Sequence, residues 1–150
     1  MPIEAVLFIG VPGSGKTSFF KERLFSTHVR ISLDLLKTRH RERRFLEACL
    51  TTEQRFVIDN TNPTRAERAR YIAPAKARRF EVAGYYFGSK VEDCLKRNAG
   101  RPEAERVPEV AIFAAAKRME LPALAEGFDR LFYVHLDEGR FVVEEWRNEV

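Results

Sequence analysis

Cysteine and histidine are scarce in this 150-residue chain, which contains two cysteines and three histidines. Cys49 and Cys94 lie within helical patterns rather than at paired loop spacings, so we expect no disulfide framework and no disulfide-linked partner. His28, His40 and His135 show no metal-ligand spacing, among themselves or with the cysteines, which argues against a zinc site. A reducing, cytoplasmic location fits this composition best.

Long hydrophobic runs are also missing. The longest run near the start, residues 5–9, is far shorter than the roughly 20 residues that cross a bilayer, and it lacks the flanks of a signal peptide. We therefore expect no membrane partner and no targeting segment. There are no internal repeats or low-complexity segments, and the length predicts a single domain, residues 1–150, with its own core.

Basic residues outnumber acidic ones by 26 to 22, and the excess is unevenly distributed. The last 14 residues hold five acids and two arginines, so residues 1–136 carry a formal charge of +7. Much of the excess lies in segments 37–44 and 65–79. This favours a polyanionic partner, but the same charges also fit ordinary solvated helix faces, and charge alone leaves both interpretations open.

Apolar runs alternate with helical patterns along the chain. The runs predict five strands, at residues 3–9, 29–31, 56–59, 80–87 and 131–136, of which those at 3–9 and 56–59 have the pattern of buried strands. Helices are predicted at residues 16–25, from 35 to about 50, and from 65 to a bend or end near Pro74. Two further helices are predicted, one that ends near residue 98 and one from Pro108 to about 120. Thr64 with Glu67, and Ser89 with Glu92, have the capping-box spacing of helix starts. This rhythm predicts an α/β fold with a parallel sheet between helices.

Residues 10–17 read Gly-Val-Pro-Gly-Ser-Gly-Lys-Thr and satisfy G-x-x-x-x-G-K-[ST], directly after a predicted strand and at the start of a helix. The glycines let backbone N–H groups surround a phosphate, and the helix N-terminus adds positive potential. Lys16 is expected to reach the β- and γ-phosphates, and Thr17 to ligate Mg²⁺. We predict ATP or GTP binding by the following residues: Gly10, Pro12, Gly13, Ser14, Gly15, Lys16, Thr17 and Ser18.

Two acidic residues follow predicted strands, where functional side chains gather in an open α/β sheet. Asp34 is placed to accept a proton from an attacking hydroxyl, although an N-cap or first-turn role would explain it without chemistry. Asp59 has the position of the acid that supports Mg²⁺ beside a phosphate loop. A turn-forming role ahead of Asn60, Asn62 and Pro63 competes with that interpretation.

Two arginines stand four residues apart before Pro108. Arg97 and Arg101 flank a short segment that contains Gly100. Guanidinium groups placed there suit charge stabilisation over a nucleotide, although most surface arginines have no such role. The sequence therefore indicates Arg97 and Arg101 as candidate catalytic residues beside Lys16 and Asp34.

Taken together, these segments resemble the 5′-hydroxyl polynucleotide kinases, which are P-loop phosphotransferases of nucleic-acid end repair. The resemblance covers most of the chain, from the first predicted strand to the fifth. Besides residues 10–17 and Asp34, it rests on these strings: Ile58-Asp59-Asn60-Thr61-Asn62-Pro63, Arg97-Asn98 with Arg101, Val107-Pro108, and Leu124-Ala125-Glu126-Gly127-Phe128. The Asp-Asn-Thr-Asn-Pro and Ala-Glu-Gly-Phe strings are much more specific than the phosphate loop alone.

The resemblance implies a P-loop kinase fold with about five strands in the order 2-3-1-4-5. It implies ATP and Mg²⁺ as cofactors, the 5′-hydroxyl end of DNA or RNA as substrate, and Asp34 as the general base. Arg97 and Arg101 match arginines of the family's lid. Thr17 and Asp59 are expected at the metal, and the acceptor strand is expected along Lys37, Arg41, Arg44 and Arg65.

One departure from the family affects the acceptor side. Many members have Asn-Arg-Asp where this chain has Ser32-Leu33-Asp34, so one cation is missing, and Lys37 stands where some members carry an arginine that binds the acceptor phosphate. Two alternatives therefore stay open: a small-molecule kinase that uses the same Asp34, and a noncatalytic nucleotide-responsive module. No motif of a phosphatase or ligase accompanies these segments, so we expect a stand-alone kinase of undetermined oligomeric state.

Overall fold

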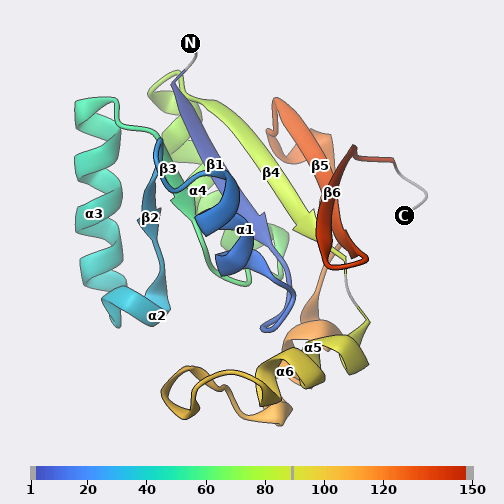
Figure 1. Ribbon diagram of the computed structural model, residues 1–150. Coiled ribbons are helices and arrows are strands. Elements are labelled where there is room, and N and C mark those ends of the chain that lie inside the picture. Colours follow the sequence, from blue (N-terminus) through green and yellow to red (C-terminus); the bar gives the residue numbers. More distant parts are fainter. Residues whose placement is uncertain (1–2, 89, 148–150) are drawn as a thin grey trace.

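The computed structural model describes residues 3–88 and 90–147. Its centre is a six-stranded sheet in the order β2-β3-β1-β4-β5-β6 (Figure 1). The strands are β1 Glu4–Ile9, β2 Val29–Ile31, β3 Phe56–Ile58, β4 Glu81–Phe87, β5 Arg130–Asp137 and β6 Arg140–Glu145. Strands β1 to β5 run parallel, and β6 pairs antiparallel with β5. The predicted α/β class and the order 2-3-1-4-5 are confirmed.

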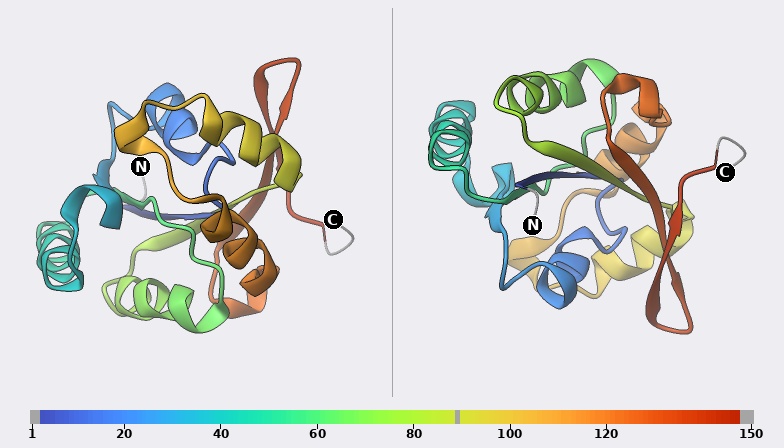
Figure 2. Two further views of the ribbon diagram at one scale, coloured as in Figure 1. Left: turned by 90° about the horizontal axis from the view of Figure 1, so that it is seen from below. Right: turned by 90° about the horizontal axis from the view of Figure 1, so that it is seen from above.

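Helices cover both faces of the sheet, with α1 on one face and α4 on the other (Figure 2). The helices are α1 Lys16–Arg23, α2 Leu33–Leu36, α3 Arg39–Thr52, α4 Arg65–Ala77, α5 Val91–Ala99 and α6 Glu109–Arg118, with 3-10 turns η1 Glu103–Glu105 and η2 Leu124–Glu126. Within β1, Val6 and Phe8 belong to the apolar core under α1, whereas Leu7 belongs to the core under α3 and α4. In the described part of the chain, no helix is long and apolar enough to span a membrane.

The prediction of one helix from residue 35 to about 50 is wrong in one respect, because the structure has two helices there. The break falls at Lys37, whose φ is 73°, in the left-handed region that L residues rarely adopt. Thr38 then starts α3, and its side chain accepts a hydrogen bond from the Arg41 N–H. Residues 37–44 contain no apolar side chain, so the apolar periodicity is interrupted here, and this gap together with the N-capping threonine was the available signal.

The strand β6 was not predicted, because the acidic residues near the end of the chain concealed a hairpin. Glu138 and Gly139 form its turn, and both have positive φ values, 50° and 76°. Such two-residue turns are marked most strongly by Asn-Gly or Asp-Gly, and Glu-Gly is a weaker signal. The strand matters to the fold, since Phe141 packs edge-on against Phe19 of α1, with the ring centroids 5.3 Å apart.

Helix starts follow their predicted signals in part. Thr64 caps α4 as expected, with its hydroxyl accepting from the Glu67 N–H at 3.2 Å, and α4 continues through Pro74 to its end at Ala77. Helix α5 begins after Lys90 without a side-chain cap, and the predicted cap at Ser89 lies outside the described residues.

A buried ion pair explains part of the specific Leu124–Phe128 string. Arg68 of α4 is fully buried, and its guanidinium donates to the two carboxylate oxygens of Glu126 at 2.8 and 3.2 Å. Arg68 also donates to the backbone oxygen of Asn62 at 2.9 Å. Gly127 follows with φ 116°, a conformation that favours glycine. The string therefore ties η2 to α4 and to the loop after β3.

We predict that Glu126→Gln lowers the free energy of unfolding by about 3 kcal/mol, because it leaves the buried Arg68 cation without its counter-ion. Urea unfolding followed by circular dichroism measures the change. The exposed Glu105, replaced by Gln, serves as the matched control and should change stability by less than about 0.5 kcal/mol. Equal, small losses in the two variants would show that the pair contributes little.

Candidate active site

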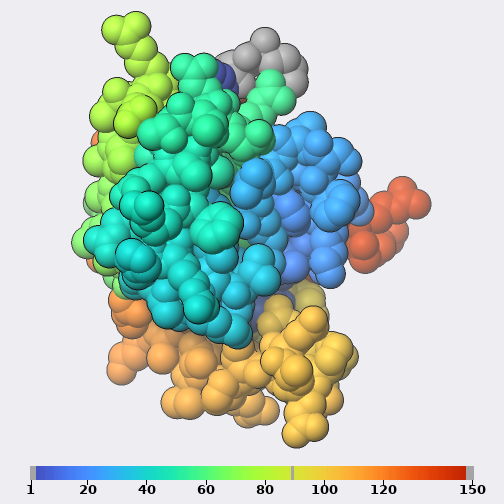
Figure 3. All heavy atoms as spheres, turned by 90° about the vertical axis from the view of Figure 1, so that its left-hand side faces the viewer, coloured from blue at the N-terminus to red at the C-terminus, as the bar shows by residue number. Residues whose placement is uncertain are grey.

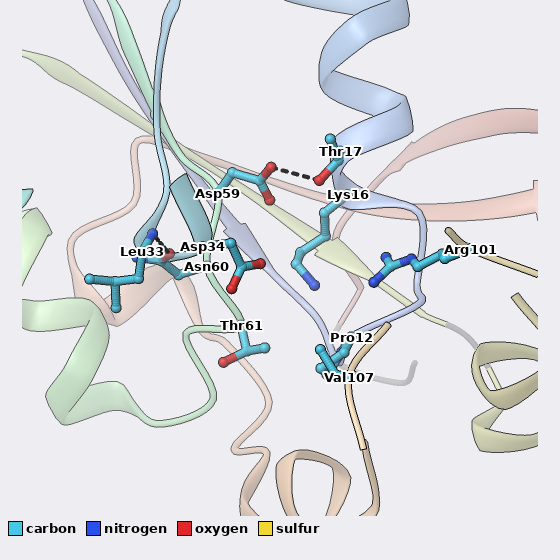
Figure 4. Close-up of a pocket in the computed structure, with 10 residues that line it drawn as sticks. All are labelled: Pro12, Lys16, Thr17, Leu33, Asp34, Asp59, Asn60, Thr61, Arg101 and Val107. Carbon is cyan, nitrogen blue, oxygen red and sulfur yellow. Dashed lines mark hydrogen bonds between the residues drawn. The ribbon is translucent and has the colours of Figure 1, made fainter. Parts of the chain in front are cut away.

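The carboxyl ends of β1, β2 and β3 border one pocket, which residues after α5 close from the other side (Figure 4). Six residues predicted from the sequence line it together: Pro12, Lys16, Thr17, Asp34, Asp59 and Arg101. An apolar wall of Pro12, Leu33 and Val107 completes much of the lining. The structure thus brings the phosphate-loop residues and the candidate base to one place.

The phosphate loop has the backbone that its glycines predict. Gly13 and Gly15 have φ values of 83° and 98°, and α1 begins directly after Gly15. A Cβ at Gly13 would lie 2.5 Å from the backbone oxygen of Cys94 in α5, so only glycine fits there. The Ser14 hydroxyl is buried without a hydrogen-bond partner among the described residues, whereas buried polar atoms are normally paired.

The Lys16 ammonium lies inside the loop rather than in solvent. It donates to the backbone oxygens of Gly10 and Val11 at 2.9 and 3.0 Å. Burial lowers the pKa of Lys16 to about 8, and the nearby Asp59 carboxylate opposes that shift. A polyphosphate would give this buried cation a stronger anionic partner than two carbonyls do.

Thr17, Asp59 and Arg30 form a polar cluster beside Lys16. The Thr17 hydroxyl donates to Asp59 Oδ2 at 3.0 Å, and Arg30 Nε of β2 donates to the same oxygen at 2.8 Å. Arg30 Nη2 also donates to the Thr17 hydroxyl at 3.4 Å. Asp59 is almost completely buried, so water does not solvate its carboxylate, and the Arg30 guanidinium compensates its negative charge instead.

The donor atoms of this cluster fit a magnesium–nucleotide complex. Thr17 and Asp59 offer a hydroxyl and a carboxylate, which are the hard oxygen donors that Mg²⁺ takes while keeping water and phosphate oxygens as its other ligands. Within residues 3–88 and 90–147, no group of three or more His, Cys, Asp or Glu side chains could hold a metal by itself. The two residues predicted for the metal therefore suit an ion that arrives with the nucleotide.

Asp34 lies on α2 at the exposed side of the pocket. Its carboxylate points toward the space in front of Lys16 and Arg101 (Figure 4). The alternative of an N-cap or first-turn role is wrong for the cap, because Ser32 is the N-cap and its hydroxyl accepts from the Asp34 N–H at 3.2 Å, but Asp34 does lie in the first turn. The carboxylate is thus left to face the pocket from the first turn of the helix.

The two candidate arginines have different positions. Arg101 lines the pocket with Lys16, as expected for a group over the phosphates. Arg97 instead donates to the backbone oxygen of Gly13 at 2.7 Å and lines a second hollow, with Tyr133 and His135, outside the first. Arg97 therefore holds the phosphate loop in this structure, and only Arg101 shares the pocket with Asp34.

The predicted acceptor cations do not line the pocket. Lys37, Arg41, Arg44 and Arg65 are all exposed. Arg41 donates to the backbone oxygen of Leu36 at 3.3 Å, and Arg44 lies 3.5 Å from Glu47. Helix α3 forms much of one face of the molecule (Figure 3). Ser18, predicted to bind nucleotide, is exposed on α1 and does not line the pocket.

Sequence reasoning missed two side chains that organise the site. Arg30 was not singled out, although it is the one charged residue of a short apolar strand and so indicated a buried acid nearby. Asn60 was noted only as part of the string after β3. Its side chain accepts from the Leu33 N–H at 2.9 Å and so contacts the residue before Asp34.

We predict that the affinity for Mg-ATP falls as the pH rises above about 8. Lys16 is charged below its pKa of about 8 and neutral above it, so binding at higher pH requires proton uptake. The Kd should increase by up to about tenfold per pH unit between about pH 8.5 and 9.5. Calorimetry in buffers of different ionisation enthalpy should show proton uptake at about pH 9.

The exposed Lys21 of the same helix, replaced by Met, provides the control and should leave this profile unchanged. A Kd that stays constant from about pH 7 to 9.5 would contradict the assignment of a buried, phosphate-binding Lys16.

Comparison with known proteins places the chain in a family. A family model described as AAA domain matches residues 6–122, which is most of the chain. A curated relative from Schizosaccharomyces pombe, named bifunctional polynucleotide phosphatase/kinase, is 29% identical over 129 residues. That match covers 83% of this chain and 32% of the relative, so the chain spans about a third of the relative's length.

Solved structures agree on the fold. The structure of Chaetomium thermophilum Kti12 in complex with ADP-AlF3 has a TM-score of 0.66 and 19% identity, and the match covers 89% of this chain and 90% of that one. A gluconokinase from Sinorhizobium meliloti 1021 has a TM-score of 0.61 and 17% identity, with 88% and 82% covered. The chain therefore belongs to the AAA domain family as a P-loop kinase domain, and its predicted resemblance to the polynucleotide kinases is confirmed.

Proposed function

We propose that this protein transfers the γ-phosphoryl group of ATP to the 5′-hydroxyl end of DNA or RNA. The observation that carries the proposal is the position of Asp34, whose carboxylate faces the pocket shared by Lys16 and Arg101 (Figure 4). An acceptor hydroxyl between Asp34 and the loop would meet both a proton acceptor and the γ-phosphate. Positioning and charge stabilisation are the main catalytic requirements of phosphoryl transfer.

Each residue of the pocket has a chemical role in this proposal. Asp34 orients the acceptor hydroxyl and takes its proton. Lys16 and Arg101 offset the negative charge that spreads over the transferring group. Thr17 and Asp59 hold Mg²⁺, which supplies positive charge at the phosphate oxygens when bound. Arg97 supports the reaction indirectly, because it keeps the Gly13 carbonyl of the loop in place.

A polynucleotide acceptor is supported by surface charge and by the curated relative. Lys37, Arg41 and Arg44 are exposed cations on and just before α3, the helix that follows α2 and Asp34 along the chain. Cations outside the pocket are suitable for the phosphates of a strand whose 5′ end enters it. The name of the Schizosaccharomyces pombe relative refers to polynucleotides, which is consistent with this acceptor class.

A small-molecule acceptor is the second candidate, and one observation favours it. The side of the pocket next to Asp34 is lined by Leu33 rather than by a cation, and Pro12 and Val107 extend the apolar wall. An acceptor without phosphates needs no cation there. Incubation of the protein with labelled ATP and a panel of 5′-hydroxyl oligonucleotides, nucleosides and sugars decides between the two candidates, and we expect label only on the oligonucleotides.

We predict that Asp34→Asn lowers kcat by roughly 10²- to 10⁴-fold, which is the usual contribution of a positioned proton acceptor. The Kd for ATP should stay near that of the wild type, since Asp34 belongs to α2 and not to the phosphate loop. Steady-state kinetics and calorimetry measure the two quantities. If ATP binding were lost together with turnover, Asp34 would instead serve the nucleotide or the fold.

We predict that oligonucleotide binding depends steeply on salt. Each phosphate neutralised by a cation of α2–α3 contributes a slope of about −0.7 to log affinity against log salt for single strands. Replacing both Arg41 and Arg44 by Glu should reduce the steepness of that salt dependence and weaken oligonucleotide binding, while leaving the affinity for ATP unchanged. A salt-independent reaction that accepts nucleosides as well as oligonucleotides would favour the small-molecule kinase.

A further inference from the structure

A buried carboxylate that the proposed reaction does not use lies behind the site. Glu42 of α3 is only 3% exposed, although glutamate is rarely buried without partners. The Tyr71 hydroxyl donates to it, 3.0 Å from both of its oxygens, and Arg39 donates to it at 3.0 Å. Asn60 Nδ2 completes the set at 2.9 Å. This single carboxylate therefore connects α3, α4 and the loop after β3.

The Glu42 carboxylate fixes which way the Asn60 amide points. A carboxylate accepts hydrogen bonds and cannot donate them, so the NH₂ group of Asn60 must face it. The Asn60 carbonyl then faces the opposite way, where it accepts from the Leu33 N–H at 2.9 Å (Figure 4). Burial, and next the Glu42 carboxylate, raise the pKa of Tyr71, which keeps its hydroxyl protonated as a donor.

The segment that receives this contact cannot hold its own position. Helix α2 has four residues, none of them buried, and isolated helices of that length are not stable in water. Its start is fixed at two points, by Asn60 at the Leu33 N–H and by Ser32 at the Asp34 N–H. Because Asp34 is the next residue after Leu33, the Asn60 contact sets where its carboxylate lies.

We propose that Glu42 is a positioning residue that acts through Asn60 to hold Asp34 at the acceptor side of the pocket. This inference rests on the proposed function only in giving Asp34 a part in turnover. A misplacement of about 1 Å in a reacting group can cost about 10²-fold in rate, so Glu42 affects turnover although it does not line the pocket itself. A purely structural network would change stability and leave kcat unaltered.

The proposal is tested by swapping the amide and the carboxylate side chains between positions 60 and 42. Asn60→Asp alone places a second carboxylate against Glu42. At a pH at which both are ionised, their repulsion turns the new side chain away from the Leu33 N–H, so kcat should fall by about 10²-fold with KM for ATP unchanged. In the double variant Asn60→Asp, Glu42→Gln the glutamine NH₂ can donate to the new carboxylate, which again accepts from Leu33. Its kcat should return to within about fivefold of the wild type.

Hydrogen exchange at the Leu33 and Asp34 amides gives a readout independent of activity. Exchange should be faster in Asn60→Asp and slow again in the double variant, in protein that circular dichroism shows to be folded. Glu47→Gln, at an exposed glutamate of α3, is the matched control for Glu42 and should change neither kcat nor the exchange rates.

The outcomes separate the two proposals. Unchanged exchange in Asn60→Asp, or a loss of turnover that the double variant does not recover, overturns the positioning role. The hydrogen exchange can follow the expected pattern while the Asp34→Asn variant stays active. That result would support the positioning of α2 and refute Asp34 as the general base.

Discussion

Four consecutive residues after β3 make the hydrogen bonds on which the rest of the site depends. Asp59 binds the Thr17 hydroxyl of α1, and the Asn60 side chain accepts from the start of α2. The Thr61 carbonyl accepts from the first amide of the phosphate loop at 3.0 Å. Asn62 donates to the backbone of β1 at 2.7 Å and has a φ of 46°, which asparagine tolerates better than most residues. Every partner belongs to a different segment.

This arrangement separates the donor side of the site from the acceptor side while fixing both to one strand end. Asp59 and Thr61 contact the helix and loop that would hold a nucleotide, and Asn60 contacts the helix that carries Asp34. The distance between donor and acceptor groups is therefore set by a few bonds along one short chain segment. Phosphoryl transfer depends on such positioning more than on any covalent contribution of the protein.

The features predicted correctly from the sequence are those encoded locally. The phosphate loop, the five parallel strands and the Thr64 cap each leave a signal within a few residues. The features missed depend on contacts between distant segments. Arg30 becomes part of the site only because β2 lies beside β3, and the break at Lys37 needs a left-handed backbone that a lysine does not signal. Arg97 was predicted near the phosphates, yet the structure uses it to hold the loop, which no spacing could reveal.

The most direct test of this account is the effect of Asn62→Ala on both halves of the site, because Asn62 lines no part of the pocket. ATP affinity and the single-turnover rate of phosphoryl transfer to a 5′-hydroxyl oligonucleotide would be measured in folded protein. The account predicts that both fall, since the loop and α2 lose their common support. A folded variant that keeps wild-type affinity and rate would contradict it.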